Sequence, residues 1–375
     1  MQKKRWRVSM FALVAALALA MSIAACGGDD DDSGGGGGGG GDGGGGGGSI
    51  ALLLPETKTA RYESQDRPNF ERKVGELCSD CEILYSNADQ DPAKQQQQAE
   101  AAITKGAKVL VLDPVDAASA GAIVNRAKQS QIPVISYDRL ITDADIDYYI
   151  SFDNERVGKL QGDALVGKLD EDGAKGDIVM INGAPTDNNA KLFKEGAHSV
   201  IDDSSFKVAK EYDTPDWSPD KAQQEMEQAI TASGKDGFVG VYAANDGTAG
   251  GAIAAMKSAG IDPATRPTTG QDAELAAVQR ILAGEQYMTV YKAIIPEAEA
   301  AAELAVALVN GKQPPSGLVN DKIDNGMEEV PSVLLKPVPV TKDQIKDTIV
   351  KDKFWSVDEI CAGKYAAACK EAGIQ

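Results

Sequence analysis

The sequence predicts an α/β protein that consists of two Rossmann-like, doubly wound lobes. From residue 50 onward, short apolar runs alternate with helix-length segments, the pattern of strands and helices that build parallel sheets. The apolar runs are nearly continuous, as they are in strands buried on both faces. Ten such runs are many for a single sheet. We therefore expect two sheets, each covered by helices on both faces.

The expected strands follow one another along this region. They are residues 50–54, 82–86, 108–112, 133–137, 147–152, 177–181, 207–212, 237–243, 268–270 and 287–291. The clearest helical segments between them are residues 93–105, 119–130, 220–233, 248–259 and 297–310. Asp91-Pro92 provides a cap and a first-turn proline for the first of these helices, and Gly311 ends the last.

The N-terminus, residues 1–25, predicts an export signal. Four basic residues precede an apolar run over residues 10–21, which is too short for a comfortable membrane span. The segment ends in Ile23-Ala24-Ala25-Cys26, which resembles a bacterial lipobox. We expect cleavage before Cys26 and lipidation of that cysteine, which would anchor the protein to a membrane by acyl chains alone. The alternative is an ordinary cleavage site with an incidental cysteine.

Residues 26–48 are expected to form a tether between this anchor and the fold. Sixteen of the 40 glycines lie between positions 27 and 48, interspersed with five aspartates. Such a segment buries no core, and its random-coil span is roughly 25 Å. A phosphate-binding loop is the alternative use of many glycines, but no Gly-Lys-Ser/Thr follows and no strand precedes.

Charge and histidine content exclude two classes of function. The chain has 57 acidic and 38 basic residues, a net charge of −19, which argues against binding to nucleic acid. A single histidine argues against a histidine-based metal site or catalytic triad. That residue, His198, lies in a helical stretch and is interpreted as an ordinary surface or packing residue.

Four cysteines remain after Cys26, and export to an oxidising compartment predicts that they pair. We predict the disulfides Cys78–Cys81 and Cys361–Cys369. A zinc site is disfavoured because the two pairs are far apart in the sequence and the second spacing is wrong. A redox role for the first pair is weak, because it precedes a strand rather than a helix.

Polar residues follow several of the expected strands, where ligands bind in open α/β sheets. These segments are Tyr137-Asp138-Arg139, Phe152-Asp153-Asn154, Ala244-Asn245-Asp246, Gly270-Gln271-Asp272 and Tyr291-Lys292. Carboxylates, amides and cationic groups together suit a ligand with many hydroxyl groups. Asp246 is expected to cap the helix that follows, whereas Asn245 faces the site. Asp143, Asp145 and Asp147 resemble the start of a calcium loop, but Tyr148 and Asn154 break the rest of that pattern, so no metal is expected.

At these strand ends the sequence resembles the periplasmic sugar-binding proteins of ABC importers, in particular those for D-xylose and for glucose-type sugars. The resemblance extends from about residue 50 to 351. Its most specific stretches are residues 137–149, 151–154, 185–193, 245–251, 270–274 and 288–292.

The resemblance implies a type I periplasmic binding protein fold whose lobes are joined by three hinge crossovers. These should fall near Asp153-Asn154, Tyr291-Lys292 and Glu329-Val330. The first lobe would comprise residues 50–153 and 292–328, and the second lobe residues 154–291 and 329–375. Hinge closure on the ligand is the expected motion.

The resemblance also implies the ligand-binding residues. They are Arg61, Tyr62, Asp138, Arg139, Asp187, Asn189, Trp217, Asn245, Asp272 and Lys292. Trp217 would pack on a pyranose face. Tyr62 stands where the family more usually has a tryptophan, and the alternative for it is a packing role in the core.

The function implied is that of a monomeric substrate-binding lipoprotein, without a cofactor, on the outer face of the cytoplasmic membrane. It would capture a monosaccharide, with D-xylose favoured over glucose, arabinose and galactose, and deliver it to the ABC permease. The alternative is a chemosensory role, in which the protein presents the sugar to a membrane receptor that recognises the same closed form. An exported sugar-modifying enzyme is disfavoured, because Asp138, Asp187 and Asp272 lie beside donors that lower carboxyl pKa values and no nucleophile–base pair is evident.

Overall fold

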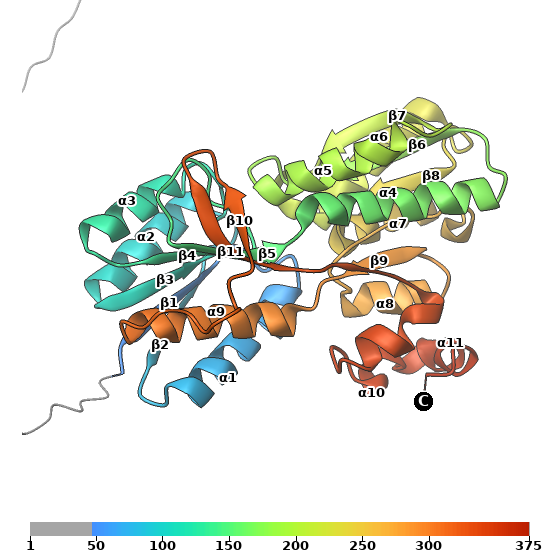
Figure 1. Ribbon diagram of the computed structural model, residues 1–375. Coiled ribbons are helices and arrows are strands. Elements are labelled where there is room, and N and C mark those ends of the chain that lie inside the picture. The colour runs from blue at the N-terminus through green and yellow to red at the C-terminus, as the bar shows by residue number, and fades with distance from the viewer. Residues whose placement is uncertain (1–46, 375) are drawn as a thin grey trace, which may run out of the picture. The chain divides into compact units, whose positions relative to one another are not determined.

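The computed structural model describes residues 47–374, which form two lobes (Figure 1). The predicted signal peptide, Cys26 and nearly all of the predicted tether lie outside the described residues. Within residues 47–374, no helix has both the length and the apolar character needed to cross a membrane.

The first lobe is built on a seven-stranded sheet of order β10-β11-β5-β4-β3-β1-β2. All neighbours are parallel except β10 and β11, which form an antiparallel hairpin. The strands are β1 (Ser49–Leu54), β2 (Glu82–Asn87), β3 (Ala107–Leu112), β4 (Val134–Tyr137), β5 (Tyr148–Phe152), β10 (Asp321–Asp324) and β11 (Glu329–Leu335). The first five agree with the predicted strands to within one residue at either end.

Helices cover both faces of this sheet, which explains its continuous apolar strands. Ile50, Leu52 and Leu54 of β1 pack under α1 (Arg67–Leu77) and α9 (Ile294–Val309). Ala51 and Leu53 point to the opposite face, under α2 (Pro92–Thr104) and α3 (Gly121–Gln129). Side chains alternate between faces along a strand, so both sets must be apolar.

The second lobe has a central parallel sheet of order β7-β6-β8 and an antiparallel pair, β12-β9. Residues 268–271 lie between these two units and join them by isolated bridges, Val241 to Thr268 and Gln271 to Val290. The predicted strand 268–270 is therefore present only as these bridges. The strands are β6 (Asp177–Asn182), β7 (Lys207–Asp213), β8 (Gly240–Ala243), β9 (Met288–Tyr291) and β12 (Val338–Thr341).

Two pairs of helices enclose the second sheet. On one face lie α4 (Asn154–Glu171) and α5 (Asn188–Ile201), and on the other α6 (Pro219–Ser233) and α7 (Asp246–Ser258). The contact between α4 and α5 depends on glycine: a Cβ atom at Gly158 would lie 1.8 Å from the carbonyl oxygen of Phe193. Glycine therefore sets how closely these helices cross.

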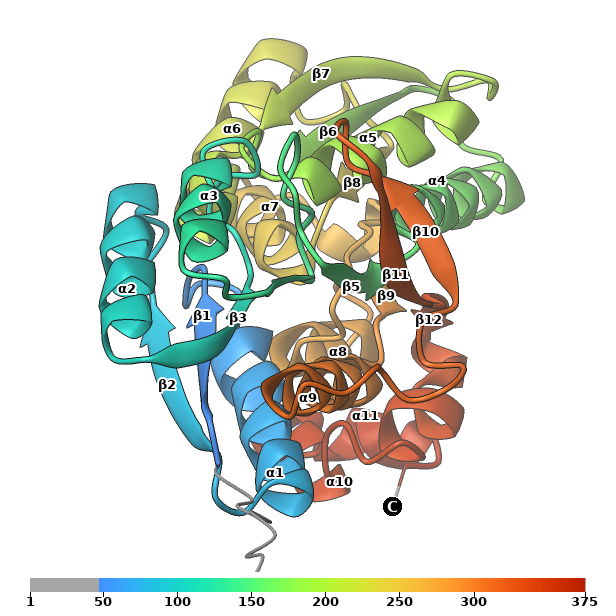
Figure 2. The ribbon, with the colours of Figure 1, turned by 60° about the vertical axis from the view of Figure 1, so that its left-hand side comes forward.

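The C-terminal segment packs against α8 (Leu275–Leu282) in the second lobe (Figure 2). It contains α10 (Val357–Ile360) and α11 (Ala366–Glu371), which are joined by the predicted disulfide Cys361–Cys369, with a Cα–Cα distance of 5.7 Å. The other predicted disulfide, Cys78–Cys81, has a Cα–Cα distance of 5.3 Å and follows α1. Both predicted pairings are confirmed.

The chain passes between the lobes three times, and the third passage differs from the expectation. The first lies between β5 and α4, and the second between β9 and α9. The third follows Leu335 rather than residues 329–330, because β11 pairs with β5 in the first sheet and β12 pairs with β9 in the second lobe. Val330 and Val333 are buried in the first lobe, which holds β11 there. Residues 329–335 thus belong to the first lobe.

Candidate functional site

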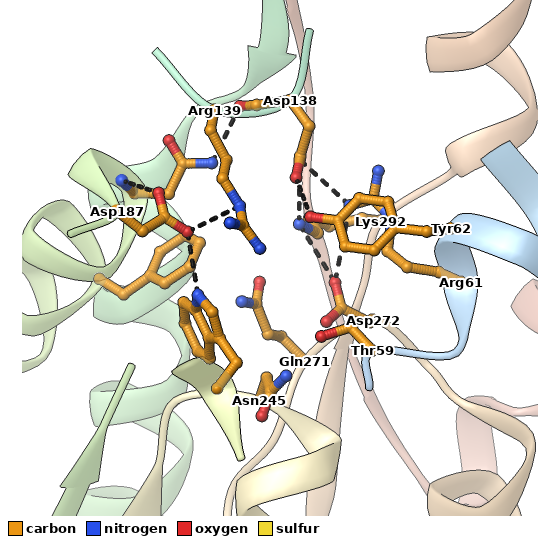
Figure 3. A pocket seen from close by; sticks show the side chains of 13 residues that line it. Thr59, Arg61, Tyr62, Asp138, Arg139, Asp187, Asn245, Gln271, Asp272 and Lys292 are labelled. Atoms are coloured by element: carbon orange, nitrogen blue, oxygen red, sulfur yellow. Dashed lines mark hydrogen bonds and ion pairs between the residues drawn. The ribbon is translucent and has the colours of Figure 1, made fainter. Parts of the chain in front are cut away.

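A pocket of about 260 Å³ lies where the two lobes meet (Figure 3). The structure brings all ten sequence-predicted binding residues into its wall. The thirteen lining residues are Thr59, Arg61, Tyr62, Asp138, Arg139, Asp187, Asn189, Phe193, Trp217, Asn245, Gln271, Asp272 and Lys292. We call this cavity the interlobe pocket.

Arg61 follows β1 and is held from behind by two carboxylates of its own lobe. Its Nε and Nη2 donate to Asp66 at 2.9 and 2.6 Å, and Nη2 also donates to Glu297 at 2.8 Å. Nη1 is left for the pocket, where it lies 3.1 Å from Asp138 Oδ1 and 3.8 Å from Asp272 Oδ1. Burial lowers the pKa of Arg61, but the surrounding carboxylates more than offset this and raise it above its usual value. The guanidinium is therefore charged and fixed in direction.

Asp138 follows β4 and collects donors from four segments of the chain. Tyr62 Oη donates to Oδ2 at 3.0 Å, and Lys292 Nζ lies 3.5 Å from Oδ1. Burial raises the pKa of Asp138, but the positive charges nearby, Arg61 first, lower it overall. Its backbone has a φ of 55°, in the left-handed region. Ser151 Oγ and Asn189 Nδ2 donate to its carbonyl oxygen at 2.6 and 2.9 Å, which holds this unusual conformation.

Arg139 makes the principal ion pair across the two lobes. Its Nε lies 3.1 Å from Oδ2 of Asp187 in the second lobe. Glu56 and Asp113 of its own lobe are farther away, at 3.7 and 3.6 Å. Its side chain is 2% exposed, so this pair is screened little by solvent.

Asp187 also organises the second-lobe wall of the pocket. Its Oδ1 accepts the backbone N–H of Asn189 at 2.8 Å and so caps α5, while Oδ2 accepts Trp217 Nε1 at 3.1 Å. The Trp217 ring meets Phe193 edge to face, with centroids 6.3 Å apart. A Cβ atom at Gly183 would lie 2.0 Å from that ring. Glycine there leaves the space that the indole occupies.

Asn245, and not Asp246, is the N-cap of α7, so that prediction was wrong. Asn245 has an extended backbone, its Oδ1 accepts the Thr248 N–H at 2.9 Å, and Thr248 Oγ1 accepts its N–H in return. Asp246 is the first helical residue and is fully buried. It accepts Gln286 Nε2 at 2.8 Å and the Glu274 N–H at 2.9 Å, away from the pocket. Asn245 still lines the pocket, as expected.

Lys292 lies on the second crossover and pairs with carboxylates of both lobes. Its Nζ is 3.1 Å from Asp272 Oδ1, in addition to its contact with Asp138. The ammonium group also lies 5.5 Å from the ring centre of Phe152 and 5.9 Å from that of Phe193. Lys292 therefore connects the charges of the first lobe to the carboxylate of the second.

Three lining residues, Thr59, Phe193 and Gln271, were not predicted. Phe193 and Gln271 lie inside two of the stretches that carry the family resemblance, 185–193 and 270–274, and that position was the available signal. Thr59 is in the loop after β1, two residues before Arg61. Sequence spacing does not show which loop residues turn inward, because loop backbone geometry is set by tertiary contacts.

The pocket is equipped for binding through hydrogen bonds. Arginine, lysine and amide groups offer donors, carboxylate and amide oxygens offer acceptors, and aromatic rings form part of the wall. No group of three or more His, Cys, Asp or Glu side chains within residues 47–374 is arranged to hold a metal ion.

Comparison with known proteins identifies the family. The model of the periplasmic binding protein domain matches residues 50–313. The chain belongs to this family. The fold is the type I periplasmic binding protein fold, as predicted.

Several relatives of this periplasmic binding protein have named ligands. The D-xylose-binding periplasmic protein of Escherichia coli is 40% identical over 315 residues, which cover 83% of this chain and 92% of the relative. The multiple sugar-binding receptor ChvE of Rhizobium radiobacter is 33% identical over 331 residues, covering 83% and 92%. A solute-binding protein of Clostridium phytofermentans, solved with β-D-glucose, has a TM-score of 0.75 and 30% identity and covers 83% of this chain and 99% of its own. These are binding proteins, and the chain is a binding protein rather than an enzyme, as predicted.

Proposed function

We propose that the interlobe pocket binds a monosaccharide, with D-xylose favoured over glucose, arabinose and galactose. The observation that carries this proposal is the meeting of ten charged, amide and hydroxyl side chains from both lobes with aromatic rings in one small cavity. The 40% identity to a D-xylose-binding protein supports the choice of sugar.

The hydroxyl groups and the C–H groups of the sugar would contact different side chains of the pocket. Asp138, Asp187 and Asp272 accept hydrogen bonds from its hydroxyl groups, while arginine, lysine and asparagine side chains donate to them. Trp217 and Phe193 provide apolar surface for the C–H groups of a pyranose ring. A pyranose, which has hydroxyl groups around the edge of its ring and C–H groups on its faces, uses the polar and the aromatic side chains at once.

Closure of the lobes around the sugar would present it to an ABC permease. Three narrow passages of the chain join the lobes, an arrangement suited to hinge motion. Hydrogen bonds already join the lobes beside the pocket, from Ala117 N to Thr186 O at 3.0 Å and from Asn189 Nδ2 to Asp138 O at 2.9 Å. We further propose that the protein acts as a monomer, exported and held at the outer face of the membrane by a lipid on Cys26.

The test is calorimetric titration of the full chain with D-xylose, D-glucose, L-arabinose and D-galactose. The test variant is Asp138→Asn, because asparagine tolerates the positive φ at this position and removes only the charge. Asp220→Asn, at an exposed site on α6, is the matched control. We expect micromolar or tighter binding of D-xylose, unchanged in the control and roughly 10- to 100-fold weaker in Asp138→Asn, since a charged acceptor is lost. If all four sugars fail to bind a folded protein, the proposal is rejected.

A further inference from the structure

Asp113 is a buried carboxylate that the binding site described above does not use. It follows β3 directly, and its side chain has no exposed surface. Neither carboxylate oxygen accepts a hydrogen bond from any group within residues 47–374. The nearest cationic atom is Arg139 Nε, at 3.6 Å from Oδ1. Because buried carboxylates are normally paired and hydrogen-bonded, this arrangement requires an explanation.

Arg139 is shared by carboxylates from both lobes. Asp113 and Glu56 belong to the same lobe as Arg139, whereas Asp187 comes from the other. Asp187 is the closest of the three, at 3.1 Å compared with 3.6 Å for Asp113 and 3.7 Å for Glu56. Asp113 and Asp187 both approach the same atom of Arg139, Nε, whose single N–H cannot point at both carboxylates at once. Separation of the lobes would remove Asp187 and leave Arg139 beside Asp113.

We propose that Asp113 and Asp187 compete for Arg139, and that Asp113 takes up a proton when the lobes close. With the lobes apart, Arg139 pairs with the Asp113 carboxylate, which holds the guanidinium in position. On closure Arg139 moves to Asp187, and a proton from solvent adds to a carboxylate oxygen of Asp113 to give the neutral acid. Asp113 is thus a positioning residue for Arg139. The inference rests on the proposed sugar function only for the ligand that drives closure.

The charges around Asp113 are consistent with this direction. Burial raises the pKa of Asp113, and Arg139 is the main group that lowers it. Asp187 raises this pKa when it is near, so closure acts on Asp113 twice: it brings a second negative charge close and draws the cation away. The charged or titratable groups that face Asp113 or Arg139 from the surrounding elements are Arg61, Tyr62, Asp138, Asp187 and Glu56.

The proposal predicts the direction in which sugar affinity changes with pH. The closed, sugar-bound form holds one more proton than the open form, so binding is favoured at low pH and weakens as pH rises. The steepest dependence that one proton allows is about tenfold in affinity per pH unit. Asp113→Asn removes the titrating group and should remove this part of the dependence.

The decisive measurement is proton uptake on sugar binding. The full chain is titrated with D-xylose and with D-glucose at several pH values from 6 to 8. At each pH the titration is done in two buffers of different ionisation enthalpy. We expect wild type and the Asp220→Asn control to take up as much as about one proton, Asp113→Asn to take up that much less, and Asp187→Asn to take up less than wild type. Asp113→Asn loses no hydrogen bond, so it should fold. Equal uptake by wild type and Asp113→Asn would overturn the proposal.

A second measurement separates failure of the sugar assignment from failure of the proposed role of Asp113. If neither sugar produces heat, the sugar assignment fails, but the titration of Asp113 can still be followed by carbon NMR of its carboxyl group, assigned by the signal missing in Asp113→Asn. Without a bound sugar the proposal places Arg139 beside Asp113, so Arg139→Gln should raise the pKa of Asp113. An Asp113 signal that titrates identically in wild type and Arg139→Gln contradicts this pairing, whatever the ligand proves to be.

Discussion

The two lobes contribute opposite net charges to the interlobe pocket. The first lobe presents two cations, Arg61 and Arg139, and one carboxylate, Asp138, and Lys292 lies on the crossover between the lobes. Among the pocket residues, the second lobe contributes carboxylates, amides and aromatic rings but no cation. The shortest ion pairs between lobes therefore join a first-lobe guanidinium to Asp187 and the crossover ammonium to Asp272. Charge complementarity between the lobes therefore favours closure, and a ligand adds to an attraction already present.

The contacts that hold the pocket side chains in place also differ between the two lobes. In the first lobe, cations are fixed by further buried carboxylates such as Asp66 and Glu297. In the second lobe, pocket residues are fixed by backbone groups, because Asp187 and Asn245 are N-caps. First-lobe geometry therefore depends on ion pairs, whereas second-lobe geometry depends on helix ends.

Removal of the Arg61 cation should have the largest effect. Arg61→Met leaves the buried carboxylates of Asp66, Glu297 and Asp138 without their shared partner. Loss of one member of a buried pair costs about 3–5 kcal/mol, and three carboxylates place this variant at about 5 kcal/mol or more. The free energy of unfolding in urea measures it. The matched second-lobe variant, Asn189→Ala, should cost about 1–3 kcal/mol, from the loss of neutral hydrogen bonds. Equal losses would refute the contrast.

Asp246 should make the stability of the second lobe depend on pH. Burial raises the pKa of Asp246 to about 7, whereas in the unfolded chain it is about 3.9. Between these values the folded state holds a proton that the unfolded state has released, so stability falls as pH rises from about 4 to 7. Three pKa units correspond to about 4 kcal/mol.

Urea unfolding at several pH values should therefore show a shallower decline in Asp246→Asn than in wild type. Glu274, whose pKa burial raises to about 8, would retain its own contribution in both. The first-lobe carboxylate Asp138 has the opposite sign, because its pKa is lowered. A decline as steep in Asp246→Asn as in wild type would show that Asp246 is ionised in the folded protein at pH 5.

Asp187→Asn should weaken the attraction between lobes while preserving the helix cap. Asparagine caps helices as well as aspartate does, so α5 should remain intact. Loss of the charge opposite Arg139 removes a charged interaction of about 1.5–3 kcal/mol, or roughly 10- to 100-fold in sugar affinity. Calorimetry gives the affinity and circular dichroism reports the helix. Unchanged affinity would mean that the Arg139–Asp187 pair does not contribute to closure.

The sequence predicts the fold well where local pattern and burial agree, and less well at the edges of the sheets. The central strands are buried on both faces, so their apolar runs are unmistakable. β10 is exposed and short, and β11 contains Pro331, so neither shows a strand pattern. Because β10 and β11 are not predicted from the sequence, the predicted third crossover lies several residues before the observed one. Pairing with β5, a long-range contact, decides where β11 belongs.

For the pocket, residue identity was more predictable than role. Asn245 and Asp246 are both good capping residues, and only the backbone conformation decides that Asn245 is the cap. The sequence does not distinguish Asp113 from the other polar residues that follow strands, so its contact with Arg139 was not predicted. Its burial beside Arg139 depends on the pairing of two strands, β3 and β4, whose carboxyl ends lie side by side in the sheet.

The smallest expected effect concerns the hydroxyl group of Tyr62. Burial raises the pKa of Tyr62, so the phenol is neutral and donates to Asp138 at 3.0 Å. Tyr62→Phe removes this donor but keeps the ring, and Asp138 retains its contacts with Arg61 and Lys292. The loss in unfolding free energy should be about 1 kcal/mol.

Sugar affinity should change by less than about tenfold in Tyr62→Phe, because Asp138 Oδ2 becomes available to a sugar hydroxyl as one protein donor is lost. Calorimetry with D-xylose on the wild-type chain and this variant measures the change. A loss of 100-fold or more would show that the Tyr62 hydroxyl bonds the sugar directly. Tyr62 would then be a first-lobe group that contacts the ligand, rather than a donor that only holds Asp138 in place.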